Sequence, residues 1–279
     1  MTGTGPQDPL LGTAVPGHVM VAGDWHMNRV QGCLAVREGA GGLPAPRVIL
    51  QLGDFGIWPG EGGAWYLAGL NRALAAADAT LAFIDGNHED HDFLASVREG
   101  MDPLAPAQVS DNIWHLPRGY RWTWHGREWL ALGGAASPDR AVRLRWNYGW
   151  SPGEYITAAD LARAGSRPAA VMITHEAPGG APVRYLDPPP SLWLGEDLDK
   201  GEEQRAMVRQ VAESVQARWL FHGHHHQGYR ASVPLRHGPL EVTGLDMDGS
   251  PGNWGILDTR TMTWSSFGPG ECTLERRRA

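Results

Sequence analysis

Cysteine is scarce in this chain of 279 residues, which holds only Cys33 and Cys272. The two are far apart and in no spacing typical of a metal site, so a disulfide framework is disfavoured and a reducing compartment is natural. Long apolar runs are also absent, since no segment approaches the roughly 18 consecutive apolar residues of a membrane span. The first residues lack the basic region of a signal peptide. We therefore expect no membrane association and a cytoplasmic protein.

Neither sign of charge is in large excess, and the formal net charge is −7. This acidic balance disfavours tight binding to duplex nucleic acid, and the basic residues Arg276, Arg277 and Arg278 are interpreted as a solvated terminal run. With 42% hydrophobic and 20% charged residues, the composition is that of an ordinary globular protein. We expect a flexible tail over residues 1–16 and a single domain over 17–279.

Short apolar runs rich in β-branched residues end in Gly, Asp, Asn or His, which predicts buried strands with polar side chains at their carboxyl ends. These runs are His18–Gly23, Arg47–Gly53, Thr80–Gly86, Val171–His175 and Arg218–Gly223. The stretches with a helical pattern are Asn28–Arg37, Ala64–Ala77, Asp90–Arg98 and Glu202–Gln216. Their alternation predicts an α/β fold. Two later runs, Leu240–Leu245 and Asn253–Leu257, are expected to complete a second sheet.

Two segments have the composition of insertions. Residues 114–150 are rich in Trp, Arg and Gly, and residues 177–201 are rich in Pro and Gly. Long irregular segments in a compact domain are usually functional or disordered. We expect both insertions to face the ligand crevice.

Side chains that bind metals follow each of the five predicted strands. They are Asp24 and His26, Asp54, Asn87, His175, and His224 with His226. In α/β sheets the ligand crevice lies beyond the carboxyl ends of the strands, so these residues can meet in space. A single Gly-Asp is common turn chemistry, and a single strand-end His is usually structural. Five such strand ends in one chain are difficult to explain by turns, and together they indicate a metal centre.

The ordered blocks Asp-x-His, Gly-Asp, Gly-Asn-His-Glu, a lone His and Gly-His-x-His span about residues 18–258. In this order they closely resemble the calcineurin-like metallophosphoesterases. The resemblance implies an α/β (α+β) fold, a four-layer αββα sandwich of two packed mixed β-sheets flanked by helices. The protein Ser/Thr phosphatase branch is disfavoured, because Phe55-Gly56-Ile57 and Asp85 stand where that branch has Asp-Arg-Gly and Arg.

The resemblance also implies a pair of metal ions and a role for each conserved position. One metal would be bound by Asp24, His26, Asp54 and His226, and the other by Asp54, Asn87, His175 and His224. Mixed nitrogen and oxygen donors favour a transition metal over Ca or Mg; Mn is preferred here, with Fe, Zn, Ni and Co as alternatives. A hydroxide that bridges the metals would attack phosphorus, while His88 donates a proton to the leaving group and Asn87 also contacts the phosphate.

Several nearby residues admit two interpretations. His222 and His225 are expected to surround the ligands or face solvent rather than form a third metal site, and Asp246, Asp248 and Glu176 are open candidates for orienting the ligand histidines. Arg140 would bind a substrate phosphate or form a structural ion pair with Asp139 or another acid. The aromatic set would stack on a nucleobase or pack in the core or a lid. It comprises Trp122, Trp124, Trp129, Trp146, Tyr148 and Trp150.

These observations predict a metal-dependent enzyme that hydrolyses a phosphodiester, with a nucleotide or a single-stranded nucleic-acid end as the favoured substrate. One alternative is a phosphomonoesterase acting on a small phosphorylated metabolite or a protein. A second alternative is a non-catalytic binding module on the same fold. The second is disfavoured because all seven candidate ligands and His88 are present.

Overall fold

The computed structural model describes residues 15–41, 45–184, 190–191 and 193–267. Cys272, the three terminal arginines, and all but Val15 and Pro16 of the predicted N-terminal tail lie outside the described residues. Within the described part of the chain, no helix is both long and apolar enough to cross a membrane.

The strands form two mixed sheets. The seven-stranded sheet has the order β13-β12-β1-β2-β3-β5-β4. Its strands are β1 (His18–Ala22), β2 (Val48–Gln51), β3 (Thr80–Phe83), β4 (Ala107–Ser110), β5 (Ile113–His115), β12 (Trp254–Asp258) and β13 (Trp264–Phe267). The six-stranded sheet has the order β10-β11-β9-β8-β7-β6. Its strands are β6 (Arg121–Trp124), β7 (Arg127–Leu132), β8 (Val171–Thr174), β9 (Trp219–His222), β10 (Tyr229–Leu235) and β11 (Gly238–Gly244).

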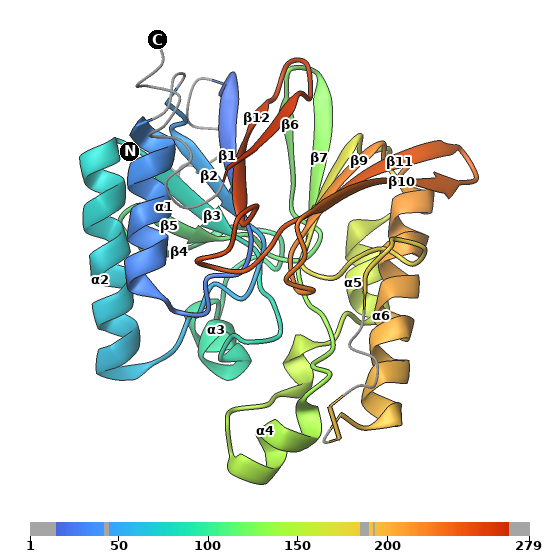
Figure 1. Cartoon of the computed structure of the whole chain (residues 1–279), viewed down its shortest axis with the longest axis horizontal. Helices are drawn as coiled ribbons and strands as arrows, with labels where there is room; N and C mark the ends of the chain where they lie inside the picture. Colours follow the sequence, from blue (N-terminus) through green and yellow to red (C-terminus); the bar gives the residue numbers. More distant parts are fainter. Residues whose placement is uncertain (1–14, 42–44, 185–189, 192, 268–279) are drawn as a thin grey trace.

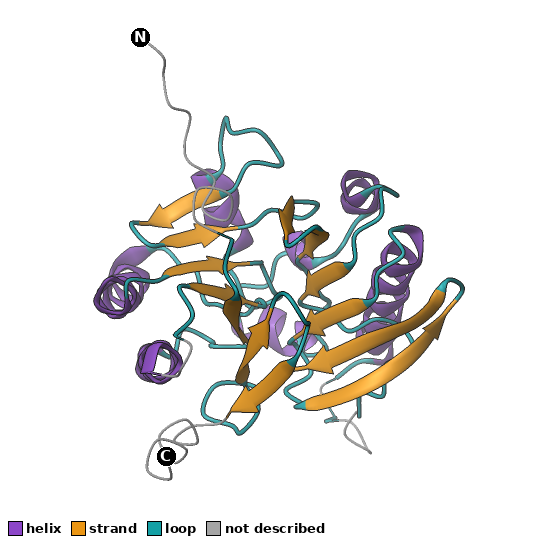
Figure 2. Cartoon of the chain, turned by 90° about the horizontal axis from the view of Figure 1, so that it is seen from above, coloured by secondary structure: helices purple, strands orange, loops and turns teal. Residues whose placement is uncertain are grey.

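Helices cover the outer faces of both sheets. The helices of the described residues are α1 (Arg29–Gly41), α2 (Gly60–Ala77), α3 (His91–Val97), α4 (Arg140–Trp146), α5 (Ala158–Ala164) and α6 (Gly195–Ser214), with a 3-10 turn at Pro152–Glu154. Helices α1 and α2 lie against the seven-stranded sheet, and α5 and α6 lie against the six-stranded sheet (Figures 1 and 2). The predicted four-layer αββα sandwich is confirmed.

The central core lies between the two sheets. Alternate residues of β1, such as Val19 and Val21, pack there with Val171 and Ile173 of β8. Two further apolar clusters fill the spaces between each sheet and its helices. Removal of these side chains from water favours the layered packing, and it fixes which loops meet at the edge of the sandwich.

The parallel pairings bring the predicted strands together. Strands β1, β2 and β3 are parallel neighbours in one sheet, and β8 and β9 are parallel neighbours in the other. The two late runs belong to different sheets, since β11 pairs with β9 and β12 pairs with β1. The prediction that both complete a second sheet is therefore right only for β11.

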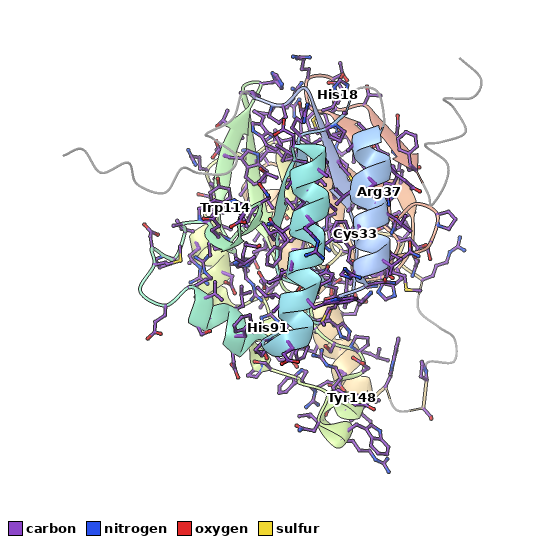
Figure 3. All side chains as sticks on the ribbon, turned by 90° about the vertical axis from the view of Figure 1, so that its left-hand side faces the viewer. His18, Cys33, Arg37, His91, Trp114 and Tyr148 are labelled. Carbon is purple, nitrogen blue, oxygen red and sulfur yellow. The ribbon has the colours of Figure 1, made fainter. Side chains whose placement is uncertain are left out.

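The segment 114–150 is an insertion only in part, which corrects the prediction. Its first half contributes β6, β7 and most of β5 to the two sheets, and the burial of β6 alternates so that Trp122 and Trp124 point inward. Only the part that carries α4 projects from the sandwich, and Figure 3 shows Tyr148 at its far end. Of the second predicted insertion, residues 185–189 and 192 lie outside the described residues, and α6 already begins at Gly195.

Candidate metal centre

The five strand ends meet at one edge of the sandwich, between the two sheets. Asp24 follows β1, Asp54 follows β2 and Asn87 follows β3, while His175 and His224 follow β8 and β9 of the other sheet. The connecting loops converge below the strands in Figure 1. The structure thus brings together all the side chains that the sequence assigned to a metal centre.

A first group of ligand-type side chains consists of Asp24, His26, Asp54 and His226. Their ligand atoms all lie within 4.8 Å of one another. Nε2 of His26 is 3.4 Å from Oδ2 of Asp54, and Nε2 of His226 is 3.0 Å from Oδ2 of Asp24. This spacing suits the shared coordination of one cation.

A second group consists of Asp54, His175 and His224, with the same spacing between ligand atoms. Nε2 of His175 lies 3.3 Å from Oδ1 of Asp54 and 3.0 Å from Oδ1 of Asn87, so the Asn87 amide oxygen joins this group. Asp54 presents Oδ2 to His26 and Oδ1 to His175. Its carboxylate therefore stands between the two groups, one oxygen toward each.

The donor set fits a pair of divalent cations. Asp24 and Asp54 are almost fully buried, at 0% and 1% exposure. Burial alone would raise the pKa of the Asp54 carboxyl, but His175 and His88 outweigh it and hold the pKa well below its ordinary value. A buried anionic carboxylate among imidazoles needs positive charge nearby, and divalent cations held by these residues would supply it.

Hydrogen bonds on the outer nitrogens orient the histidines. Nδ1 of His175 is 2.7 Å from the main-chain carbonyl of Leu52, and because a carbonyl can only accept, Nδ1 carries a proton and Nε2 is the nitrogen that would bind a cation. Nδ1 of His26 is 3.2 Å from Oδ1 of Asp248, which identifies Asp248 as its partner among the three open candidates.

Glu176 is the acid that lies beside the Gly-His-x-His segment. Its Oε1 is 2.7 Å from Nε2 of His225, and its Oε2 is 3.6 Å from Nε2 of His224. The three side chains form a further close group of ligand-type atoms. His222 points elsewhere, with Nε2 2.6 Å from the hydroxyl of Tyr229. His222 and His225 thus both contact groups outside the two sets that share Asp54.

Glycine precedes four of the candidate ligands, Asp24, Asp54, Asn87 and His224, and a side chain would clash at each of these glycines. A Cβ on Gly86 would lie 2.2 Å from Oδ1 of Asp54, and a Cβ on Gly223 would lie 2.1 Å from Oδ1 of Asp24. The backbone is strained in the same loops, since Asp54 and His224 have φ angles of 50° and 67°. Such left-handed non-glycine residues are uncommon and concentrate at functional sites.

His88 stands outside both ligand groups. Its main-chain N–H donates to Oδ1 of Asp54 at 2.8 Å, and its ring lies edge-on to the His26 ring with centroids 5.7 Å apart. Burial lowers the pKa of the imidazole, although the Asp54 carboxylate acts in the opposite direction. The side chain is placed beside the candidate metal pair rather than in it.

Three residues that sequence reasoning did not single out hold the ligand loops. Glu89 accepts hydrogen bonds from the main-chain N–H groups of Phe55 and Gly86, at 2.7 and 2.8 Å, and so links the second and third motifs. The Asn87 side-chain amide donates to Oγ of Ser137 at 3.0 Å, which turns Oδ1 toward His175. Arg143 donates to the same hydroxyl. Only Glu89 had a sequence signal, its place in the third block.

Arg140 already has anionic partners in the structure. Its guanidinium forms ion pairs with Glu196 and Asp197 at the start of α6, and it lies 5.7 Å from the centroid of the Trp150 ring. Of the two interpretations of Arg140, the structure shows the ion pair. Its partners are Glu196 and Asp197 rather than Asp139. Phosphate binding by Arg140 would require these pairs to open.

The aromatic set is divided between the core and the surface. Trp122, Trp124 and Trp129 are buried between the sheets and contact one another, with the centroids of Trp122 and Trp129 5.4 Å apart. Trp146 and Tyr148 are 58% and 64% exposed on the projecting segment. The buried three are core residues and cannot stack on a ligand.

A cavity of about 1180 Å³ opens beside the candidate metal centre. Asp54, Asn87, His88, His224 and His226 form part of its wall. None of the six aromatic residues predicted as a platform lines it, and Trp193 and Tyr229 do. The cavity exceeds the roughly 300 to 1,000 Å³ of typical ligand pockets.

Comparisons with known proteins identify a fold and no close relative. No family model and no curated protein matches the chain. TT1561 of Thermus thermophilus has a similar solved structure, with a TM-score of 0.51 and 11% identity over 91% of this chain and 99% of that one.

Two further matches have lower TM-scores. The phosphopantetheinyl hydrolase PptH of Mycobacterium tuberculosis matches with a TM-score of 0.44 and 15% identity over 84% of this chain and 91% of that one. The sulfate thiohydrolase SoxB of Thermus thermophilus matches with a TM-score of 0.41 and 12% identity. The match covers 90% of this chain and 44% of that one. At such identities the likeness concerns the fold alone. With its two packed mixed sheets and its five motifs at one edge, the chain thus shares the fold of TT1561, and this is the layered fold that its sequence resemblance implied.

Proposed function

We propose that this protein is a binuclear metal-dependent phosphoesterase that hydrolyses a phosphodiester. The observation that carries the proposal is the position of Asp54, whose two carboxylate oxygens face two separate groups of ligand-type side chains. A carboxylate placed in this way can bridge two cations. Asp24, His26 and His226 would complete one site, and Asn87, His175 and His224 would complete the other.

Two divalent cations bound there would activate water and stabilise negative charge on the phosphoryl group. The side chains of the protein itself orient the groups that would bind these cations. Ser137 and Arg143 fix the amide of Asn87, whose oxygen can then serve a cation while its loop contacts the phosphate. The mixed nitrogen and oxygen donors suit a transition metal, and we propose Mn, with Fe, Zn, Ni or Co as alternatives.

His88 is the candidate general acid. Its ring lines the cavity beside Asp54 and Asn87 without joining either ligand group, so a nitrogen remains for the substrate. Its backbone is fixed by the hydrogen bond to Asp54. From this position the imidazole can donate a proton to the leaving oxygen as the ester bond breaks.

A diester is favoured over a monoester by the charges near the centre. A monoester carries one more negative charge at phosphorus, which enzymes usually neutralise with arginine. Of the three arginines of α4, Arg140 is engaged with acids and Arg143 with Asn87 and Ser137, while Arg145 does not line the cavity. The large cavity also accommodates a bulky ester group such as a nucleoside.

The test compares bis(p-nitrophenyl) phosphate with p-nitrophenyl phosphate, using protein stripped of metal and then loaded with Mn, Zn, Ni or Mg. We expect metal-dependent turnover, with a higher kcat/KM for the diester. Preference for the monoester would support the phosphomonoesterase alternative. Absence of turnover of both esters with every metal would overturn the enzymatic function and support a binding module on this fold.

A further inference from the structure

The cavity continues from the metal centre to a separate set of basic and aromatic residues. Arg184, Trp193, Tyr229 and Arg230 line it, and none of them belongs to the five motifs. Arg184 is the last described residue before residues 185–189 of the predicted insertion over 177–201. Tyr229 and Arg230 are the first two residues of β10. The cavity is thus a continuous space with candidate metal ligands in one region and two arginines in another.

Neither guanidinium has a hydrogen-bond or ion-pair partner among the described residues. Other arginines of the chain, such as Arg140 and Arg209, form ion pairs with acids. Two unpaired arginines that line one cavity create a positive region in a chain of net charge −7. Such a region attracts an anion.

The acids of the cavity do not neutralise this pair. Asp197 is paired with Arg140, and Glu176 lies beside the fourth and fifth motifs, with Oε1 2.7 Å from Nε2 of His225. Asp246 lies beside the first motif, since its carbonyl oxygen would be 2.4 Å from a Cβ on Gly23. Asp139 adjoins Ser137, which holds Asn87, and Asp54 is itself a candidate ligand. The negative charge therefore gathers near the metal motifs or is already paired.

The backbone of Arg184 is fixed against the last metal motif. Its N–H donates to Oε1 of Gln227 at 2.9 Å, and its carbonyl accepts from Nε2 of Gln227 at 2.6 Å. Gln227 directly follows the candidate ligand His226. Arg230 lies in β10, paired with Thr243 of β11. The backbone of Arg184 is thus tied to the last metal motif, and that of Arg230 is held in the six-stranded sheet.

We propose that Arg184 and Arg230 form a second anion subsite, which binds a phosphate group carried elsewhere on the substrate. The substrate class is then a nucleotide-sized phosphodiester with an additional phosphate, such as a 3′-phosphorylated nucleoside 5′-ester. Arginine suits this role because its planar fork binds phosphate through two hydrogen bonds. Trp193 and Tyr229 provide aromatic surface for the organic part of the substrate. The subsite rests on the proposed function of the metal centre.

The test uses two chromogenic diesters that differ by one phosphate: thymidine 5′-(p-nitrophenyl phosphate) and its 3′-phosphorylated form. For the unaltered protein loaded with Mn, we expect kcat/KM to be about tenfold higher for the 3′-phosphorylated ester, the effect of one charge-assisted contact. This preference should shrink as ionic strength rises, because salt screens the contact.

Arg184→Gln and Arg230→Gln should each remove most of the preference while leaving turnover of the plain ester within about twofold, since neither residue contacts the candidate ligands. Arg218→Gln is the matched control. Arg218 is an exposed arginine just before β9, at the opposite end of that strand from the metal motif. This variant should keep the preference unchanged.

Binding by calorimetry separates failure of the subsite from failure of catalysis. Thymidine 3′,5′-bisphosphate should bind to the unaltered protein about tenfold more tightly than thymidine 5′-monophosphate does. The two nucleotides should bind to the Arg230→Gln variant with equal affinity. If the plain ester is hydrolysed but the extra phosphate changes neither kcat/KM nor affinity, the subsite is wrong and the phosphoesterase function stands. If neither ester is hydrolysed yet the bisphosphate preference appears and depends on both arginines, the subsite stands without the catalytic function.

Discussion

The guanidinium of Arg143 donates to the main-chain carbonyl of Asn87 at 2.9 Å. Arg143 belongs to α4, in the projecting segment, and is only 3% exposed. It also donates to Oγ of Ser137 at 2.6 Å, and this hydroxyl accepts the side-chain amide of Asn87 at 3.0 Å. The projecting segment thus reaches into the candidate centre and orients one of its ligands.

Arg143→Lys should therefore weaken the second metal site. Lysine keeps the charge but cannot reproduce the fork that contacts Asn87, Ser137 and the carbonyl of Gly149. We expect an affinity for the second metal lower by about 10- to 100-fold, as for other groups that orient ligands. Titration with Mn, followed by elemental analysis, measures this. Arg145→Lys on the exposed side of the same helix should bind metal normally, and equal loss in both variants would contradict the role of Arg143.

Asp54→Ala and His88→Ala should separate metal binding from proton transfer. Loss of the shared carboxylate should remove bound metal, because both ligand groups include Asp54. Loss of His88 should leave the metal content near that of the unaltered protein while turnover falls about 10²- to 10⁴-fold. Elemental analysis and kinetics on the same preparations decide the matter. Full metal occupancy in Asp54→Ala would refute the bridging position.

Trp122 and Trp146 should differ sharply in their contributions to stability. Trp122 is 2% exposed between the sheets, whereas Trp146 is 58% exposed on α4. Trp122→Ala should lower the free energy of unfolding by about 3 to 5 kcal/mol, through lost burial and a residual cavity. Trp146→Ala should change it by less than about 0.5 kcal/mol. Urea unfolding measures both, and similar values would contradict the division of the aromatic set.

Asp160 should make stability depend on pH in the acidic range. Burial alone would raise the pKa of its carboxyl, but Arg118 and the hydrogen bonds from Thr157 outweigh it and lower the pKa. A lowered folded-state pKa gives a stabilisation that is complete above the unfolded value of about 3.9 and is lost as pH falls below it. Asp160→Asn should therefore cost about 1 to 3 kcal/mol at pH 7 and less at pH 3.

Urea unfolding at the two pH values tests this expectation. The exposed Asp199 in α6 provides the control, and Asp199→Asn should have little effect at pH 7. An Asp160→Asn deficit of the same size at pH 7 and pH 3 would show that the carboxylate charge is not the source of the stabilisation.

The sequence alone determined the fold and the membership of the candidate centre. Buried strands and the polar residues that end them leave a local pattern, so His18–Gly23 or Val171–His175 can be recognised without knowledge of their neighbours. Parallel strands then place such ends at one edge of a sheet. The glycines before Asn87 and His224 belong to the same local signal, because the ligand loops pack too closely for a Cβ.

Tertiary structure decided what depends on contacts between distant segments. Arg143 and Ser137 reach Asn87 across about 50 residues of sequence, and no local pattern marks such a pairing. The same holds for Arg140, whose side chain was open to phosphate or to acid until α6 placed Glu196 and Asp197 against it. The aromatic residues over 122–150 suggested a single stacking platform. Trp122, Trp124 and Trp129 instead lie in strands that point them into the core, and Trp146 and Tyr148 are exposed on the projecting segment. Residue types and local periodicity carry the first kind of information, whereas long-range hydrogen bonds and packing exist only once the sheets have closed on each other.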